Sequence, residues 1–149
     1  LAYWGRKLGR PELAEPVPHV SIRADGRMLS QALSNILKNA AEAIGARAGG
    51  AKGRITARLI SDAGGVAFEV EDNGVGLPAK DRDRLTEPYV TTREKGTGLG
   101  LAIVKRILED HGGELELTDA REAPGALAVL RLPASARAKS ESQPESVTV

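Results

Sequence analysis

Residues 93–104 read REKGTGLGLAIV, and the rest of the chain is organised around this stretch. It opens with the cations Arg93 and Lys95, passes through glycines at alternate positions, and becomes an apolar-periodic helix at once. Glycine permits positive φ and close backbone approach, so successive N–H groups can converge on an anion. The helix that follows adds its own N–H groups and the positive end of its dipole. The stretch predicts a polyphosphate cradle behind a mobile lid, although a glycine hinge that caps a helix has the same local pattern.

Composition limits the classes of protein to which the 149-residue chain can belong. The length suits one domain, and the scarcity of aromatic residues means that Leu, Ile, Val and Ala build its core. A net charge of +1 argues against a nucleic-acid partner, and the absence of cysteine excludes disulfides and thiolate metal sites. No apolar run approaches the roughly 20 residues that span a bilayer. We therefore expect a soluble domain in a reducing compartment, the cytoplasm.

A long helix is predicted from about residue 27 to residue 47, with Asp25 as its N-cap. One face is apolar, at helical spacing: Leu29, Leu33, Ile36, Leu37, Ala40 and Ile44. The opposite face is polar with the same repeat: Gln31, Asn35, Asn39 and Glu42. Because asparagine is a poor helix former, two asparagines four residues apart indicate a functional face, with an ordinary solvated face as the alternative.

Two strands are predicted at residues 54–60 and 66–71. The alternate apolar positions of the second strand lead directly to Asp72, which lies on the same parity. A carboxylate at the end of a core-facing row must have a partner or a shifted pKa. Gly74 and Gly76 follow at once, in a turn whose backbone can come close to a ligand.

The other elements are read from periodicity and from glycine and proline. We expect a strand at 20–22, a short helix at 78–85, a lid over 86–98, a helix at 98–111, and strands near 115–117 and 126–132. This order predicts an α/β (α+β) two-layer sandwich with helices on one face of a mixed sheet. Residues 1–18 are interpreted as a connector from an upstream domain, 19–133 as the domain, and 134–149 as a disordered tail.

Three elements in a fixed order resemble a known family. They are Asn35 and Asn39 on the long helix, residues 72–76 after a strand, and residues 96–101 before the second helix. They resemble the N, G1 and G2 boxes of the ATP-binding catalytic domain of sensor histidine kinases, within the fold shared with DNA gyrase, Hsp90 and MutL. The wording of residues 87–96 is most similar to the nitrogen-regulation, NtrY-like branch. The resemblance implies the Bergerat fold, a mostly antiparallel five-stranded sheet covered on one face by about three helices.

The same resemblance implies roles for individual residues. Asp72 would accept a hydrogen bond from the adenine amino group of ATP, with Gly74 and Gly76 bringing the backbone close to the ring. Asn39 would give an oxygen to Mg²⁺, and Asn35 would support the metal or phosphate shell. The phosphates would be held by the glycine stretch and its cations: Arg93, Lys95, Gly96, Thr97, Gly98, Leu99 and Gly100. The implied reaction is transfer of the γ-phosphoryl group to a histidine, with Asn35, Asn39 and Lys95 in catalytic roles.

The chain departs from the family pattern at several positions. Glu42 stands where many histidine kinases have lysine, Thr86 and Tyr89 replace two aromatic residues of the lid, and Ala126 replaces a hydroxyl residue often linked to adenine. The gyrase and Hsp90 group has a water-activating glutamate at the position of Asn35, which cannot act as a base. The resemblance therefore favours a kinase over an ATPase.

A substrate histidine is not predicted within the chain, because neither His19 nor His111 lies in a His-Glu-x-x-x-Pro-like helix. We therefore expect the acceptor on an upstream dimerisation and histidine-phosphotransfer domain, and a response regulator receiver domain as a further partner. The parent protein would be a homodimer, this chain by itself a monomer, and anchoring of the parent in the inner membrane is left open. The alternatives are a non-catalytic ATP-binding or docking module of the same fold and a stand-alone serine kinase of the anti-sigma-factor type.

Overall fold

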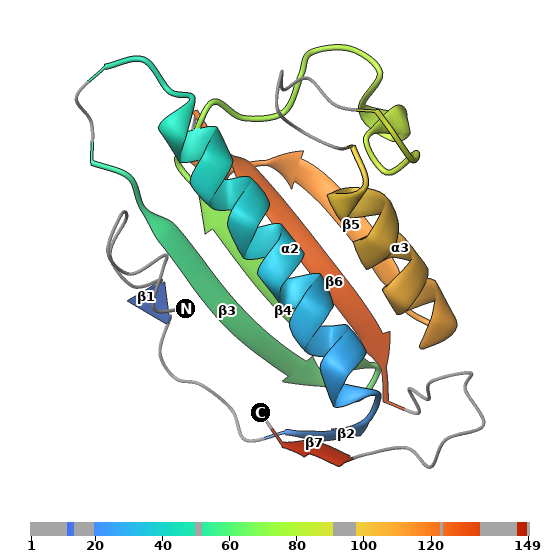
Figure 1. Ribbon diagram of the computed structural model, residues 1–149. Helices are drawn as coiled ribbons and strands as arrows, with labels where there is room; N and C mark the ends of the chain where they lie inside the picture. Colours follow the sequence, from blue (N-terminus) through green and yellow to red (C-terminus); the bar gives the residue numbers. More distant parts are fainter. Residues whose placement is uncertain are drawn as a thin grey trace.

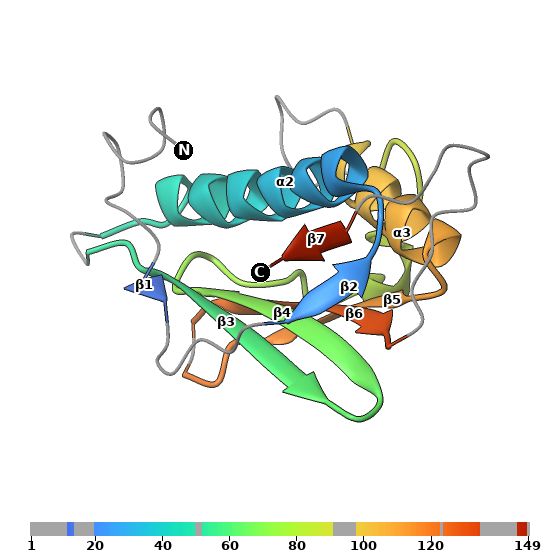
Figure 2. The same cartoon turned by 90° about the horizontal axis from the view of Figure 1, so that it is seen from below.

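The computed structural model describes residues 12–13, 20–49, 52–90, 98–122, 124–134 and 146–148. This part of the chain forms two layers, a sheet and the helices that cover one of its faces (Figures 1 and 2). The sheet has the strand order β1-β3-β4-β6-β5. Its strands are β1 (Glu12–Leu13), β3 (Ile55–Asp62), β4 (Gly65–Asp72), β5 (Glu114–Asp119) and β6 (Ala126–Pro133). The predicted two-layer fold with helices on one face is confirmed.

Strand pairing places the end of β4 in the middle of the sheet. β3, β4, β6 and β5 are antiparallel neighbours, and the two-residue β1 joins β3 in parallel at the edge. Val66, Val70 and Asp72 share one face of β4 and are buried, as their parity predicts. Because β4 has a neighbour on each side, the carboxylate at its end lies against β6 and beneath the helices rather than at a rim of the sheet.

The helix layer consists of α2 (Gly26–Gly45) and α3 (Gly100–Asp110), which lie side by side over the sheet (Figure 1). Asp25 caps α2 as predicted, because its Oδ1 accepts hydrogen bonds from the backbone N–H groups of Arg27 and Met28 at 3.0 and 3.1 Å. Both helices bury an apolar stripe against the sheet: Leu29, Ala32, Ile36, Ala40, Val104, Ile107 and Leu108. The polar face of α2 is thereby turned toward α3 and the end of β4.

His111 joins the two helices at the end remote from the cavity described below. Its ring is 1% exposed and uses both nitrogens, since Nδ1–H donates to the carbonyl of Ile107 at 2.7 Å and Nε2 accepts the N–H of Asp25 at 3.0 Å. The fixed roles of the two backbone groups require the neutral imidazole with its proton on Nδ1. His111 therefore forms hydrogen bonds with a backbone group at the end of α3 and with another just before the start of α2.

Replacing His111 by alanine is expected to destabilise the fold by about 3 kcal/mol, because it leaves a cavity and removes the acceptor of a backbone N–H. Urea unfolding followed by circular dichroism measures the loss. Glu109→Ala, an exposed change on the same helix, is the control and should shift stability by less than about 0.5 kcal/mol. Equal stabilities for the two variants would contradict a structural role for this histidine.

The other face of the sheet carries a network of ion pairs. Glu69 and Glu71 alternate with the core-facing residues of β4, and Glu69 is 8% exposed. Arg121 contacts Glu69 at 2.7 Å, and Arg58 contacts Glu71 at 3.2 Å. The N–H of Arg121 also donates to Glu71 at 2.6 Å. The arginines thus cover two carboxylates of the central strand β4, and these carboxylates are compensated by hydrogen bonds as well as by charge.

The same network predicts how stability depends on pH. Burial by itself raises the pKa of Glu71, but the hydrogen bonds from the Arg121 N–H and Arg58, with the charges of both arginines, lower it below its usual 4.5. Unfolded chains therefore bind the proton first, so this stabilisation is complete above about pH 4.5 and is lost as pH falls toward the folded-state pKa. Glu71→Gln should cost about 1–2 kcal/mol at pH 7 and flatten the fall in stability below pH 5.

Urea midpoints measured at each pH unit from 7 to 3 test this expectation. Glu116→Gln is the matched control, because Glu116 pairs with Arg131 at 2.9 Å but is half exposed. It should change the midpoint little at any pH. A Glu71→Gln profile parallel to that of the unchanged chain would contradict the assignment.

Two predicted elements differ from the structure. The segment at 20–22 forms β2 (Ser21–Arg23), but it lies beside the start of α2 and pairs with β7 (Ser146–Thr148) in a separate two-stranded sheet (Figure 2). It cannot reach the main sheet because the chain turns into Asp25, the cap of α2, two residues later. The short helix at 78–85 is reduced to one 3₁₀ turn, η1 (Arg82–Arg84), because Asp81 takes a positive φ of 56°.

Short strands form in both segments that flank the predicted domain. Three residues of the tail expected to be disordered form β7, and residues 12–13 of the expected connector form β1. Most other residues of these two segments, and the lid positions 91–97, lie outside the described residues. Within the part of the chain that the structure describes, no helix has the length and apolarity to cross a bilayer.

Candidate functional site

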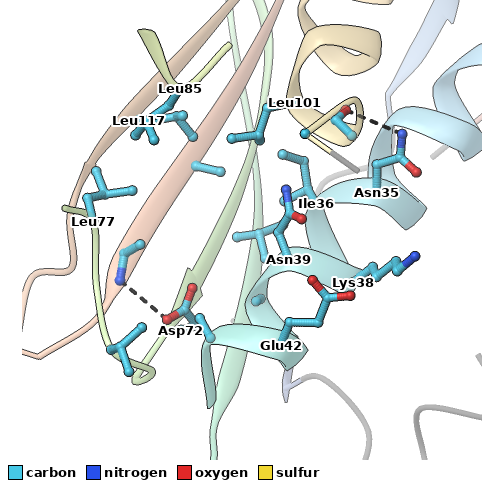
Figure 3. A pocket seen from close by; sticks show the side chains of 18 of the residues that line it. Asn35, Ile36, Lys38, Asn39, Glu42, Asp72, Leu77, Leu85, Leu101 and Leu117 are labelled. Carbon is cyan, nitrogen blue, oxygen red and sulfur yellow. Dashed lines mark hydrogen bonds between the residues drawn. The ribbon is translucent and has the colours of Figure 1, made fainter. Parts of the chain in front are cut away.

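A cavity of about 500 Å³ lies between the polar face of α2, the end of β4 and the start of α3 (Figure 3). Its walls include Asn35, Asn39, Asp72, Gly76 and residues 98–100, so the structure brings together residues from all three of the sequence elements that we singled out. Leucines form its opposite wall: Leu77, Leu85, Leu101 and Leu117. A cavity with apolar walls and a few convergent polar groups is the usual form of a small-molecule site.

Asp72 is 7% exposed and has one carboxylate oxygen committed to the backbone. Oδ1 accepts the N–H of Gly74 at 2.8 Å and that of Ala126 in β6 at 3.4 Å. Asp72 also lines the cavity (Figure 3). The predicted position of this carboxylate at the end of a buried row is confirmed. Its contact with the Ala126 N–H was not foreseen, because a backbone amide leaves no signal in the sequence.

The glycines around Asp72 allow three backbone segments to meet. Gly76 has φ +81° and lies against the carbonyl oxygen of Gly125, which a Cβ would approach to 3.3 Å. A Cβ on Gly125 would lie 2.0 Å from the carbonyl oxygen of Asp72. Gly74 packs on Ala43 of α2 and is buried behind the carboxylate, so it supports Asp72 and is not among the residues that line the cavity.

The two asparagines of α2 lie one helical turn apart along one wall of the cavity (Figure 3). Asn35 Nδ2 donates to the carbonyl of Gly100 at 3.4 Å, which links α2 to the first residue of α3. Asn39 also lies close to this residue, because a Cβ added to Gly100 would be 3.8 Å from Asn39 Oδ1. The polar stripe of α2 therefore lines the cavity.

The start of α3 forms the other end of the cavity. The N-cap residue of α3 is Leu99, whose apolar side chain makes no capping hydrogen bond. Gly98 has φ +70°, and its carbonyl accepts the N–H of Tyr89 at 2.9 Å. Val90 and Gly98, the described residues on either side of positions 91–97, both line the cavity. Of the predicted phosphate ligands, Arg93, Lys95, Gly96 and Thr97 lie outside the described residues.

The two ends of the cavity suit different chemical groups. Near Asp72 the walls are leucine and alanine around one buried acceptor, which fits a flat heteroaromatic ring with an amino group. At the other end the N-terminus of α3 suits an anion. Three described lining residues are charged, Lys38, Glu42 and Asp72. The sequence analysis placed Glu42 on the polar face of the helix but gave it no role in the site, and it did not name Lys38. The spacing of Lys38, three residues after Asn35, could have identified it.

The donor atoms in the cavity also fit a hard divalent cation. Amide oxygens of asparagine and carboxylate oxygens are ligands that Mg²⁺ accepts, usually together with phosphates and water. Among the described residues, no group of three or more His, Cys, Asp or Glu side chains could hold a metal by itself. A cation at this site would therefore need oxygens of a bound polyphosphate to complete its coordination.

Sequence comparison places this cavity in a known group of proteins. Residues 24–136 match the model of the histidine kinase-, DNA gyrase B- and HSP90-like ATPases. The chain is 51% identical over 133 residues to the nitrogen regulation protein NtrY of Azorhizobium caulinodans, covering 86% of this chain and 17% of that protein. It is 39% identical over 112 residues to the sensor histidine kinase ZraS of Escherichia coli K12, covering 75% and 23%. The chain thus spans about a fifth of the length of these relatives.

Solved structures agree with the sequence comparison. The mycobacterial sensor histidine kinase MprB matches with a TM-score of 0.74 at 29% identity, over 91% of each chain. Full-length ShkA in complex with AMPPNP matches with a TM-score of 0.70 at 31% identity, over 91% of this chain and 28% of that one.

Proposed function

The chain belongs to the family of histidine kinase-, DNA gyrase B- and HSP90-like ATPases, and we propose that it holds Mg-ATP for phosphoryl transfer to a histidine. It is the ATP-binding catalytic domain of a sensor histidine kinase of the two-component type. The acceptor histidine, in this proposal, lies on a dimerisation domain upstream of this chain. A response regulator receiver domain is the next acceptor, and the longer protein acts as a homodimer with this domain in the cytoplasm.

One observation carries the proposal: the buried carboxylate of Asp72 and the amides of Asn35 and Asn39 face one cavity that ends at the start of α3. In the proposed arrangement the adenine lies against Asp72, with its ring along Gly76 and the leucine wall. Its phosphates extend to residues 98–100, where the N-terminus of α3 favours negative charge. Lys95 and Arg93 of the lid would add positive charge to the phosphates.

The residues of α2 would act on the phosphate end. Asn39 would give an oxygen to Mg²⁺, which neutralises charge on the transferring phosphoryl group when it is bound. Asn35 donates a hydrogen bond to the carbonyl of Gly100. Its proposed role is to fix the position of the start of α3, where the phosphates would lie, relative to α2. Neither amide can take a proton from water, and the proposal therefore assigns the chain to positioning and charge stabilisation.

Removing the amide of Asn39 tests the phosphate end. Asn39→Ala is expected to weaken binding of a non-hydrolysable ATP analogue in Mg²⁺ by about 10–100-fold and to have little effect in EDTA, because the lost oxygen serves the cation. Calorimetric titration in both buffers measures the effect. Ser34→Ala, an exposed change on the same helix, is the control and should bind like the unchanged chain.

An Asn39→Ala chain that retains the full effect of Mg²⁺ would show that the cation is held elsewhere. The transfer step is tested in the longer parent protein with γ-labelled ATP. Acid-labile, base-stable label on the parent is the expected product, because phosphohistidine has that stability, and the label should disappear with Asn39→Ala. ATP binding without any label would favour a non-catalytic module of the same fold.

A further inference from the structure

We propose that Glu42 supplies a carboxylate oxygen to the divalent cation that accompanies the nucleotide, and that this residue makes nucleotide binding depend on the cation. The inference rests on the proposed function, because it requires ATP in the same cavity. It adds a residue outside the three sequence elements. It also assigns a role to a carboxylate at a position where the resemblance led us to look for a lysine.

Glu42 is a neighbour of Asn39, the proposed cation ligand, on the face of α2 that lines the cavity. Glu42 lies three residues after Asn39, so the two side chains are neighbours on one helix face, with Cβ atoms about 5–6 Å apart. Both side chains line the cavity and come from neighbouring turns of α2 (Figure 3). A carboxylate and an amide at this spacing can place one oxygen each on the same ion, which needs oxygens at about 2.0–2.1 Å.

Charge gives a second argument. Among the described residues that line the cavity, two are anionic, Glu42 and Asp72, and one is cationic, Lys38. Asp72 lies at the end proposed for adenine, and Glu42 lies about one helical turn from Asn39, the proposed cation ligand. Without a cation, the charge of this carboxylate would oppose a triphosphate. With a divalent cation between them, the same carboxylate becomes a ligand. Glu42 therefore discriminates between the free nucleotide and its metal complex.

The test compares Glu42→Gln with the unchanged chain. The dissociation constant of a non-hydrolysable ATP analogue is measured in EDTA and in saturating Mg²⁺, and their ratio gives the coupling between nucleotide and cation. Glu42→Gln should lower this ratio about five- to tenfold, both by weakening the metal complex and by relieving repulsion in EDTA. Mn²⁺ titration followed by electron paramagnetic resonance, with the analogue bound, should show a matching loss of Mn²⁺ affinity.

Lys38→Gln is the matched control, because it changes charge on the same wall one turn away. It should not lower the ratio, because loss of a cation weakens binding of the free nucleotide at least as much as that of its less negative metal complex. A Glu42→Gln ratio equal to that of the unchanged chain, with Asn39→Ala still abolishing the effect of Mg²⁺, would overturn this inference and leave the proposed function intact. Absence of nucleotide binding by the unchanged chain in either buffer would overturn both.

Discussion

Replacing Asp72 by asparagine is expected to weaken ATP binding by about 100-fold, although the two side chains have nearly the same shape. The reason lies in the backbone around the site. Oδ1 accepts the N–H groups of Gly74 and Ala126 at 2.8 and 3.4 Å, so an asparagine must keep its oxygen there. Its NH₂ group would then point into the cavity and face the adenine amino group. The asparagine NH₂ and the adenine amino group are both hydrogen-bond donors, so the bond that the Asp72 carboxylate accepts would be lost.

Calorimetric titration with ATP and with inosine triphosphate measures this effect. The unchanged chain should prefer ATP, because inosine lacks the amino group, and Asp72→Asn should lose the preference. Glu71→Gln is the matched control, since it makes the same chemical change one residue earlier on the opposite face of β4. Its nucleotide affinity should stay within about twofold of the original. An Asp72→Asn chain that still binds ATP tightly and prefers it to the inosine nucleotide would exclude the proposed contact.

Replacing Gly125 by alanine is expected to destabilise the fold by at least about 4 kcal/mol, the range reserved for severe steric conflicts. A Cβ at this position would lie 2.0 Å from the carbonyl oxygen of Asp72 and 3.0 Å from Ala120 Cβ. The backbone also has φ +148°, which side chains rarely adopt. Relief of the clash would require β6 to move away from the end of β4. That movement would carry the Ala126 N–H away from Asp72.

Urea unfolding and soluble yield at a fixed expression level measure the loss. Gly45→Ala is the control, because a Cβ at this last residue of α2 meets nothing within 4 Å. It should stabilise the chain by about 0.5–1 kcal/mol, as alanine does in helices. A Gly125→Ala chain with unchanged stability would show that β4 and β6 do not approach each other this closely.

Local patterns predicted the elements that matter most for the site. The apolar repeat and Asp25 located α2 to within two residues at each end, and the parity of β4 predicted the burial of Asp72. These two predictions were confirmed because each depends on residues that are close together in the sequence. The asparagine pair was predicted to mark a functional face, because asparagine is costly in a helix interior, and both asparagines line the cavity. Their role stays a prediction.

Other predictions failed where distant residues decide the outcome. The expected helix at 78–85 contracts to η1, where Arg82 reaches the carboxylate of Asp119 at 3.0 Å, a partner 37 positions away. The segment at 20–22 forms a strand, but its partner is β7 near the other end of the chain. Local sequence periodicity cannot predict either contact, because both depend on how the elements pack in three dimensions.

Helical and strand periodicity in the sequence predicted α2, α3 and the strands β3, β4, β5 and β6 in their order, together with the polar residues on them. The contacts between those residues depend on how distant segments pack. The register of β4 against β6 brings the Ala126 N–H to a carboxylate 54 positions away, and so orients the acceptor toward the cavity. Packing of α2 beside α3 puts Asn35 against Gly100, 65 positions away, because two apolar stripes must share one face of the sheet.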